Sequence, residues 1–274
     1  MHTKRSAPMD EGSFTLINAM YQMASSLRIL AASSCALMTA CSGLPTYPVP
    51  VESSVSTDNT TLASASQRPE VWSAVWQHYT LPGKQASQYA FARLDGRDAM
   101  AVTAHSSASL LRQNVRIEPQ ELAQIKFSWK VPELITLADL AVRDNADSPV
   151  RIVLAYEGDR AKLSAKNLML SELAHTLTGE PLPYATLMYV WCNSRPSGTV
   201  ITSAGTDRIR KMVVESGAKN VNTWIDYERD IRADYEKAFG EAPGALVGIG
   251  IMTDSDNTRT TTRAWYGQVT LANK

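Results

Sequence analysis

Alternating hydrophobic and polar positions predict several β-strands along the chain. In residues 125–131, Ile125, Phe127, Trp129 and Val131 alternate with polar residues, which is the two-residue period of a strand with one buried face. Residues 185–192 (ATLMYVWC) are apolar at nearly every position, which is typical of a central strand covered on both sides. The same pattern predicts strands at residues 150–156, 208–215, 246–253 and 264–271, with weaker candidates at 89–94 and 99–105.

Two segments have helical spacing instead. Residues 161–177 place four apolar residues on one stripe and are followed by Gly179, a typical helix end; the stripe consists of Leu163, Leu170, Ala174 and Leu177. Residues 224–239 place five large apolar residues on one face, namely Trp224, Tyr227, Ile231, Tyr235 and Phe239. Thr223 and Asp226 resemble a capping box before this second helix. Since strands dominate without a sustained βαβ alternation, we predict a mainly β fold, a two-sheet antiparallel jelly-roll-like sandwich with two inserted α-helices.

The first 41 residues have the features of a bacterial lipoprotein leader. Arg28 precedes an apolar run at residues 29–38, and the run ends in Thr39, Ala40 and Cys41, which describes a secretory signal too short to span a bilayer. Residues 37–41 resemble the lipobox, with Met38 at the position where the motif prefers Leu. The resemblance implies a signal peptide at residues 1–40 and lipidation (palmitate) of Cys41. The alternative is an ordinary signal peptide with an incidental cysteine, and Met20 and Met23 are alternative start sites.

Residues 41–67 and 68–274 differ sharply in composition. Residues 42–67 are half Ser, Thr and Pro and contain no Lys or Arg, so we expect a disordered tether after the lipidated cysteine. From Arg68 onward the aromatic and β-branched content rises, and we predict one globular domain over residues 68–274. We expect a monomer that is anchored to the membrane through Cys41 and lies in the cell envelope, at the periplasmic face of the outer membrane.

Charge and cysteine content narrow the function classes. The chain has 27 Lys and Arg against 27 Asp and Glu, without clusters, which argues against a nucleic-acid partner. Three cysteines without a CxxC pair exclude a disulfide framework. Cys192 lies within an apolar strand, so we expect a buried and inert thiol.

Several long strings resemble the bacterial domain-of-unknown-function family 3047. They are YATLMYVW (184–191), VVESG (213–217), DYEKAFGEAP (234–243) and IGIMTDSDNT (249–258). The resemblance extends from about Arg68 to the C-terminus. It implies a secreted or envelope protein with a jelly roll similar to carbohydrate-binding modules, and it implies no reaction.

Asp254 and Asp256 follow directly on the predicted strand at residues 246–253. Four interpretations stay open, and three of them concern the carboxylates themselves. The pair could stop the strand and shape a turn, which is the interpretation we favour and for which Asp254→Ala would cost about 1 kcal/mol. It could bind Ca²⁺ with carboxylates from another loop, although the rest of an EF-hand is missing. It could also provide the paired carboxylates of a glycoside hydrolase, although both lie on one segment.

A ligand site is the remaining interpretation of this region. Strand parity places Gly248, Gly250, Met252 and Asp254 on one face, and two glycines leave that face shallow, for a ligand or, as we favour, for the helix at 224–239. Trp191 beside Asn193 could stack on a sugar, although a core position is the stronger interpretation of Trp191.

Arg151 is expected on a solvated strand face or beside a carboxylate in a groove. We therefore predict a glycan- or ligand-binding, non-enzymatic sandwich with a site among Arg151, Trp191, Asn193, Asp254 and Asp256. The alternative is a hydrolase of envelope polysaccharide that uses Asp254 and Asp256.

Overall fold

The protein is described by a computed structural model, which covers residues 76–272, all inside the compact unit Val55–Lys274. The predicted signal peptide, Cys41 and the tether lie outside the described residues. Within the described residues, no helix is long and apolar enough to cross a membrane.

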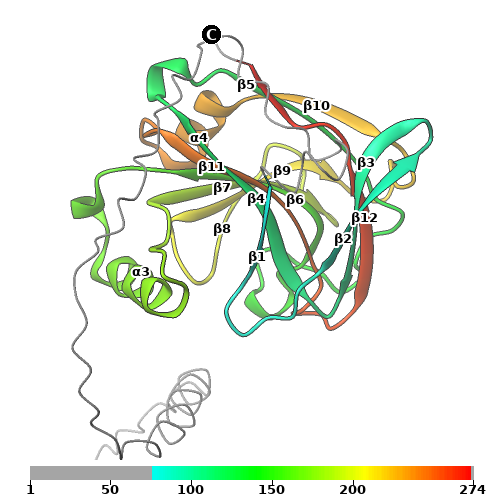
Figure 1. The fold of residues 1–274 in the computed structure, drawn as a ribbon, viewed down its shortest axis with the longest axis horizontal. Coiled ribbons are helices and arrows are strands. Elements are labelled where there is room, and N and C mark those ends of the chain that lie inside the picture. The colour runs from blue at the N-terminus through cyan, green and yellow to red at the C-terminus, as the bar shows by residue number, and fades with distance from the viewer. Residues whose placement is uncertain (1–75, 273–274) are drawn as a thin grey trace, which may run out of the picture. The chain divides into compact units, whose positions relative to one another are not determined.

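Two sheets make up the fold (Figure 1). The seven-stranded sheet has the order β1 (Gln77–Thr80), β4 (Ala108–Ile117), β11 (Leu246–Asp254), β6 (Ser148–Tyr156), β7 (Ala185–Cys192), β9 (Ile209–Ser216), β8 (Val200–Thr202). The six-stranded sheet has the order β10 (Ile225–Asp230), β5 (Gln124–Lys130), β12 (Thr261–Tyr266), β3 (Arg97–His105), β2 (Gln88–Leu94), and β13 (Thr270–Ala272) also pairs with β5. The predicted mainly β sandwich is confirmed, with one parallel pair, β7 and β9, in otherwise antiparallel sheets.

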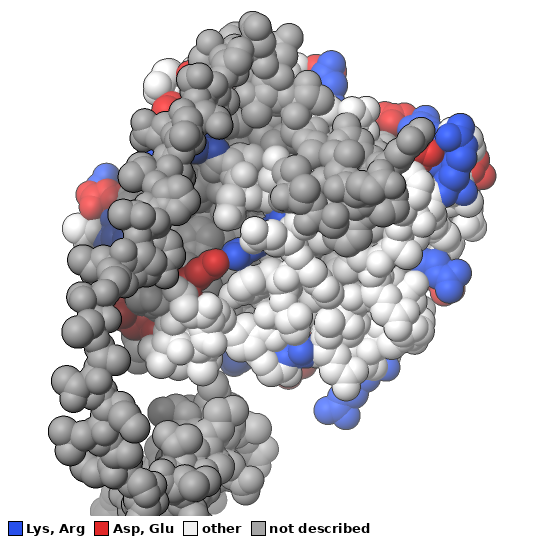
Figure 2. Space-filling view, viewed as in Figure 1, with Lys and Arg blue, Asp and Glu red and all other residues white. Residues whose placement is uncertain are grey.

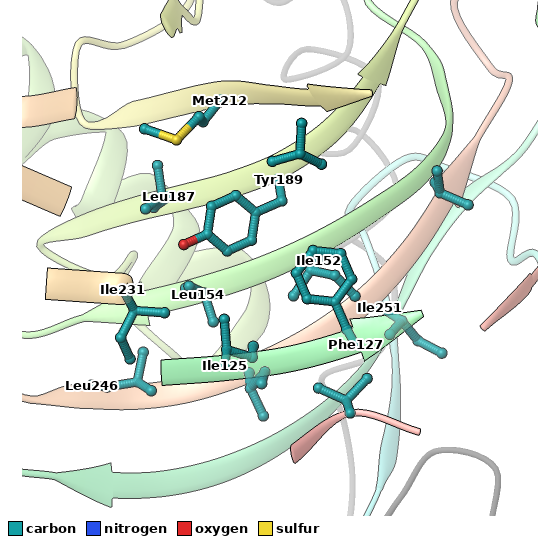
Figure 3. Packing of buried hydrophobic residues seen from close by; sticks show 14 of the residues in the cluster. Ile125, Phe127, Ile152, Leu154, Leu187, Tyr189, Met212, Ile231, Leu246 and Ile251 are labelled. Atoms are coloured by element: carbon teal, nitrogen blue, oxygen red, sulfur yellow. The ribbon is translucent and has the colours of Figure 1, made fainter. Parts of the chain in front are cut away.

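The core lies between the sheets and is built from the strand faces that alternation predicts. Ile125, Phe127, Trp129 and Val131 are all buried on β5 and the residue after it. Figure 3 shows Phe127 meeting Tyr189 of β7 across the core, and their rings stack at 5.6 Å. Such aromatic pairs add to the hydrophobic burial that holds the two sheets together.

Helix α3 (Ala165–Thr178) starts later than predicted, because residues 160–162 form a 3₁₀ turn and the Ser164 side chain caps the helix. Gly179 ends it in the left-handed conformation with φ of 79°, as expected. The predicted apolar stripe is not the buried face: Leu177 is 56% exposed, whereas Asn167 and Ser171 are buried.

The second predicted helix is wrong in its first half. Residues 225–230 form strand β10, and α4 (Ile231–Phe239) begins only after it. The Asp230 side chain accepts hydrogen bonds from the backbone N–H groups of Arg232 and Ala233, so Asp230 is the cap in place of Thr223 and Asp226. Pairing of Tyr227 with Phe127 on β5 overrides the local helical spacing.

Alternation leaves β1, β4, β8 and β10 unpredicted, and the predicted strand at residues 264–271 is interrupted. It divides into β12 and β13 at Gly267, where a Cβ atom would lie 2.1 Å from Ser128 Oγ. Cys192 is buried as a free thiol, as expected.

Candidate ligand-binding site

A groove runs along the outer face of the seven-stranded sheet. Its volume is about 960 Å³, within the range of small-molecule sites, about 300–1,000 Å³. The floor consists of residues that alternate with the core positions of β4, β11, β6 and β7, so each strand turns one face to the core and the other to the groove.

Strand register aligns the groove residues in two rows, which run from the rim on β4 across the floor. One row crosses the sheet as Arg112, Gly250, Val153 and Met188, and the next as Asn114, Gly248, Ala155 and Thr186. The two glycines stand in the middle of both rows, where they keep the floor low. A Cβ atom at position 250 would lie 2.8 Å from the Leu110 side chain, so Gly250 also lets β4 and β11 side chains pack closely.

The prediction that the helix at 224–239 fills this shallow face is wrong. Ile231, Tyr235 and Ala238 of α4 are buried in the main core instead, and the Tyr235 ring lies 4.6 Å from that of Tyr156. Among the described residues that line the groove, none belongs to α4. The open-groove alternative is therefore the one that the structure favours.

Paired charges stand in the wall of the groove. The Arg112 guanidinium donates two hydrogen bonds of 2.7 Å to the Glu180 carboxylate and lies over the Tyr79 ring at 4.4 Å. This ion pair lowers the pKa of Glu180. Since Arg112 is on β4 and Glu180 follows α3, the pair connects two sides of the groove.

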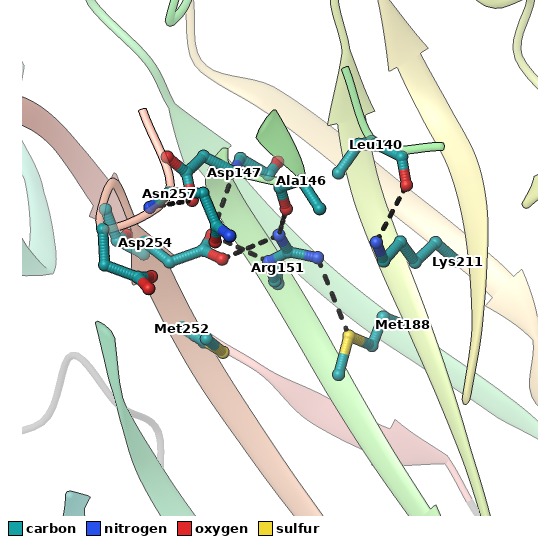
Figure 4. Close-up of polar contacts among 12 residues, drawn as sticks. Leu140, Ala146, Asp147, Arg151, Met188, Lys211, Met252, Asp254 and Asn257 are labelled. Carbon is teal, nitrogen blue, oxygen red and sulfur yellow. Dashed lines mark hydrogen bonds and ion pairs between the residues drawn. The ribbon is translucent and has the colours of Figure 1, made fainter. Parts of the chain in front are cut away.

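The predicted site residues Arg151 and Asp254 meet beyond the Met252 end of the groove floor. The Arg151 guanidinium donates to both Asp254 oxygens, at 2.9 and 2.8 Å, and Nη2 donates to the Ala146 carbonyl (Figure 4). Both side chains are almost fully buried. Burial raises the pKa of the Asp254 carboxyl, and the Arg151 charge acts in the opposite direction.

The segment between β5 and β6 covers this pair. Lys211 of β9 is buried and donates to the Leu140 carbonyl at 2.9 Å (Figure 4). Burial, together with the Arg151 charge, lowers the pKa of Lys211 to about 8. Arg151 thus takes the second of its two expected roles, that of a carboxylate partner, but under a covering loop instead of in an open groove.

The other predicted site residues have structural contacts of their own. Trp191 is 1% exposed and its Nε1 donates to the Gly217 carbonyl, so its ring faces are enclosed in the core. The Asn193 amide donates to the carbonyls of Ile135 and Ala138 and so fixes the covering loop. The structure does not bring Trp191 and Asn193 to the groove, and a direct role of either in ligand binding stays a prediction.

Three carboxylates converge after β11, those of Asp147, Asp254 and Asp256, with oxygens within 4.8 Å of one another. Each of the three carboxylates already has donors within the protein. Asp147 accepts from the backbone N–H groups of Asn257 and Thr258, and Asp256 pairs with Lys84. The cluster therefore has the contacts of a braced turn, and a catalytic pair with an open face toward substrate does not form.

We expect chelation to leave the melting temperature unchanged. Ca²⁺ takes six to eight oxygen ligands, and here it would have to displace Lys84 and compete with Arg151. Thermal melts in EDTA and in millimolar CaCl₂ test this. A melting temperature that falls in EDTA for the wild type, but not for Asp147→Asn, would establish a calcium site.

The fold places the protein in a broad class, two-sheet β-sandwiches with a groove on one outer sheet face. The family model "Protein of unknown function (DUF3047)" matches residues 74–270, and the chain belongs to this family. The search among curated proteins found no match.

Solved structures with a similar fold include carbohydrate-binding modules. A family 11 carbohydrate-binding module of the cellulosomal cellulase Lic26A-Cel5E of Clostridium thermocellum is 8% identical, with 73% of this chain and 88% of that chain covered and a TM-score of 0.36. The xyloglucanase domain of NopAA from Sinorhizobium fredii is 10% identical, with 73% and 95% covered and a TM-score of 0.38. At these values the similarity concerns the general fold alone.

Sequence reasoning missed most of the groove. Gly248, Gly250 and Met252 were identified on a shallow face, but Arg112 and Asn114 lie on β4, which alternation did not predict. The usable signal was the pair of glycines inside an otherwise apolar strand.

Proposed function

We propose that this protein is a non-enzymatic, lipid-anchored binding module of the bacterial cell envelope, which takes a glycan-bearing ligand into the groove on its seven-stranded sheet. The observation that carries the proposal is the groove itself, with its two-glycine floor. A cavity of about 960 Å³ on a rigid sheet is a preformed site. The alternative of a hydrolase is not favoured, because Asp254 is enclosed with Arg151 and Asp256 is paired with Lys84.

The polar residues around the groove suit sugar hydroxyls. Asn114 is exposed and lines the groove, and the guanidinium of Arg116 is held between Glu118 and Glu157. Amides and paired charges offer both donors and acceptors without a net charge. The lining contains three arginines and three glutamates, which agrees with a neutral ligand. Figure 2 shows blue and red residues scattered over the uncovered part of one face of the molecule.

A glycan array tests the site with one matched pair of variants. In Gly248→Leu the new side chain would stand on the floor, where its Cβ would lie 3.4 Å from Ala155 Cβ and 3.9 Å from the Gln113 carbonyl oxygen, both ordinary contact distances, so the fold should tolerate it. In Gly205→Leu the same change falls on a bend with no atom within 4 Å. We expect Gly248→Leu to lower binding at least about tenfold, a loss of about 1.4 kcal/mol, and Gly205→Leu to bind as the wild type.

Binding that is equal in the two variants would place the site elsewhere. An array without any bound glycan or glycolipid would reject the proposed ligand class. Both proteins should be shown to melt at the wild-type temperature before the arrays are compared.

The anchor is tested separately by Cys41→Ser. We expect this substitution to move the protein from the membrane fraction to the soluble periplasmic fraction, because it removes the sulfur that would carry the lipid, and several acyl chains are needed for stable anchoring. Fractionation and detergent partitioning measure the change, with Cys192→Ser as the control. Unchanged sedimentation of Cys41→Ser with membranes would contradict lipidation.

A further inference from the structure

The floor of the groove has a different chemistry from its rim. Its side chains are largely aliphatic: Leu110, Val153, Ala155, Met188, Ile209 and Met252. Sugar hydroxyls placed on such a floor would lose water without gaining hydrogen bonds, which is costly. The rim and the floor therefore suit two different parts of one ligand, a polar part and an apolar part.

Helix α3 is attached to the domain by polar contacts. The Asn167 amide donates to Asp207 at 2.6 Å and accepts from the Thr206 hydroxyl at 2.8 Å, and Ser171 accepts from Arg160. Asn167 and Ser171 are the buried residues of this helix. This reverses the usual arrangement, in which a helix buries its apolar stripe.

The apolar residues of α3 face outward instead. Met169, Leu173 and Leu177 are 66%, 40% and 56% exposed, and they follow one another at four-residue intervals on one flank of the helix. Ala174 lines the groove, and Leu177, three residues further along, is its neighbour on the helix surface. Leu182, just after α3, lines the groove and is itself 38% exposed. We take the floor, Ala174, Leu182 and the exposed apolar residues of α3 together as one continuous aliphatic surface.

We propose that this continuous surface binds an acyl chain, so that the ligand is an amphiphile whose chain lies on the groove floor and against α3. This deepens the proposed function and rests on it, since the polar part of the same ligand would meet the rim at Asn114 and Arg116. Arg112 is paired with Glu180, and Arg116 with Glu118 and Glu157, whereas Arg160 donates to Ser171 and to the Leu182 carbonyl. The lining thus has as many arginines as glutamates, so it favours neither sign of charge. A chain buries apolar area on both surfaces without requiring hydrogen bonds.

Other occupants fit the surface less well. Residues 42–67 of the chain are half Ser, Thr and Pro and offer few aliphatic side chains for this floor. A bilayer could touch the outside of α3, but a flat surface cannot reach a floor recessed between the β1 side and α3. The proposal is therefore for a single bound amphiphile.

The experiment is a titration of the Cys41→Ser protein with cis-parinaric acid, whose fluorescence rises in an apolar site. The Cys41→Ser form avoids competition from the protein's own lipid. We expect saturable binding of one probe per protein, displaced by palmitate. Gly248→Leu should abolish binding and Gly205→Leu should retain it.

The flank of α3 is tested by Leu173→Gln and Leu177→Gln. Each should raise Kd about five- to tenfold, since a partly buried leucine contact is lost. Leu137→Gln, at a 64% exposed leucine outside α3, is the matched control and should leave Kd unchanged.

The other outcomes distinguish a failure of the acyl-chain proposal from a failure of the proposed glycan ligand. A lipid-free oligosaccharide that binds in a Gly248-dependent manner, without probe binding, leaves the proposed function intact and rejects the acyl chain. Probe binding without any glycan binding supports the acyl chain and rejects the glycan. Binding to phosphatidylcholine vesicles that needs Leu173 but ignores Gly248→Leu would mean bilayer docking. Absence of probe binding rejects the proposal. The oligomeric state then decides the occupant: if the protein is a dimer and Gly248→Leu dissociates it, the groove binds a second copy of the chain. If the protein is a monomer, residues 42–67 become the candidate occupant.

Discussion

Replacing Asp254 by alanine will cost about 3–5 kcal/mol of the free energy of unfolding, the range for removing one partner of a buried ion pair. Arg151 would stay under the covering loop with a charge and no carboxylate, because it is only 3% exposed and its remaining partners are the Ala146 carbonyl and the Met188 sulfur. Against a typical total of about 5–15 kcal/mol, such a loss leaves a marginal fold. Urea denaturation of the variant and the wild type measures it.

Asp256→Ala is the matched control for this prediction. Asp256 is the next carboxylate of the same segment, but its partner Lys84 is 43% exposed. We expect a loss below about 1 kcal/mol, as for surface ion pairs. Equal losses in the two variants would show that the buried Arg151–Asp254 pair contributes no more to stability than the partly exposed Lys84–Asp256 pair.

A double substitution distinguishes the contribution of the Arg151–Asp254 ion pair to stability from that of the hydrogen bond in the turn. In Arg151→Met with Asp254→Leu, no unpaired charge remains, and stability should recover by most of the amount lost in Asp254→Ala. The turn itself would still lack the hydrogen bond that Asp254 accepts from the Ser148 backbone N–H at 3.0 Å. A double variant as unstable as Asp254→Ala would assign the loss to this hydrogen bond instead.

The structure therefore predicts a larger loss of unfolding free energy for Asp254→Ala than the sequence alone does. Asp and Asn after a strand are typical of a turn, which predicts about 1 kcal/mol. The larger value comes from Arg151, which is 103 residues away in the chain. A single sequence contains no signal for this pairing, because it depends on β6 and β11 being neighbours in the sheet.

Prediction succeeded where local pattern and tertiary packing require the same arrangement. On β5 the alternation of apolar and polar residues agrees with one buried face. On β7 the continuous apolar run agrees with a strand that is covered on both faces. Prediction failed at residues 225–230, where a helical spacing of aromatics also suits a strand that pairs with β5. It also failed on α3, where the polar residues Asn167 and Ser171 meet the body and the leucines do not.

The groove could be predicted only in part, for a physical reason. Gly248 and Gly250 indicate a shallow face, but whether a helix or a ligand covers a shallow face depends on where the nearest helix packs. Here α4 packs in the core through Ile231 and Tyr235. The aliphatic side chains that complete the floor come from five strands, and no single segment of the sequence predicts the order of these strands in the sheet.

Raising the pH above about 10 will unfold the protein steeply, because buried tyrosines, among them Tyr156, Tyr189 and Tyr266, keep their protons only in the folded state. These three tyrosines are each 0% exposed, and burial raises the pKa of each phenol above its ordinary value. In the unfolded chain these phenols ionise near pH 10. Above that pH the folded state binds more protons than the unfolded state, so stability falls by about 1.4 kcal/mol per pH unit for each tyrosine, or about 4 kcal/mol for the three.

Lys211 changes the stability in the opposite direction at lower pH. Its pKa is about 8 in the folded protein against 10.5 ordinarily, so between these values the unfolded state binds more protons and stability rises with pH. The tyrosine slope should therefore be measured above about pH 11.5, where Lys211 is almost entirely neutral in both states.

Urea denaturation at closely spaced pH values, together with tyrosinate absorbance, measures the slope, and Tyr156→Phe is the informative variant. The Tyr156 hydroxyl is buried without a hydrogen-bond partner among the described residues, so phenylalanine removes an ionisable group and costs no hydrogen bond. We expect Tyr156→Phe to be as stable as the wild type or more stable at pH 7, and to lose about 1.4 kcal/mol per pH unit from the alkaline slope. By contrast, Tyr189→Phe loses the 2.8 Å hydrogen bond to Asp234, so it should flatten the slope equally but lower stability at pH 7. A part of the tyrosinate absorbance that rises before the fold is lost, and that is missing in Tyr156→Phe, would contradict this account, because it would mean that the Tyr156 phenol ionises inside the folded protein.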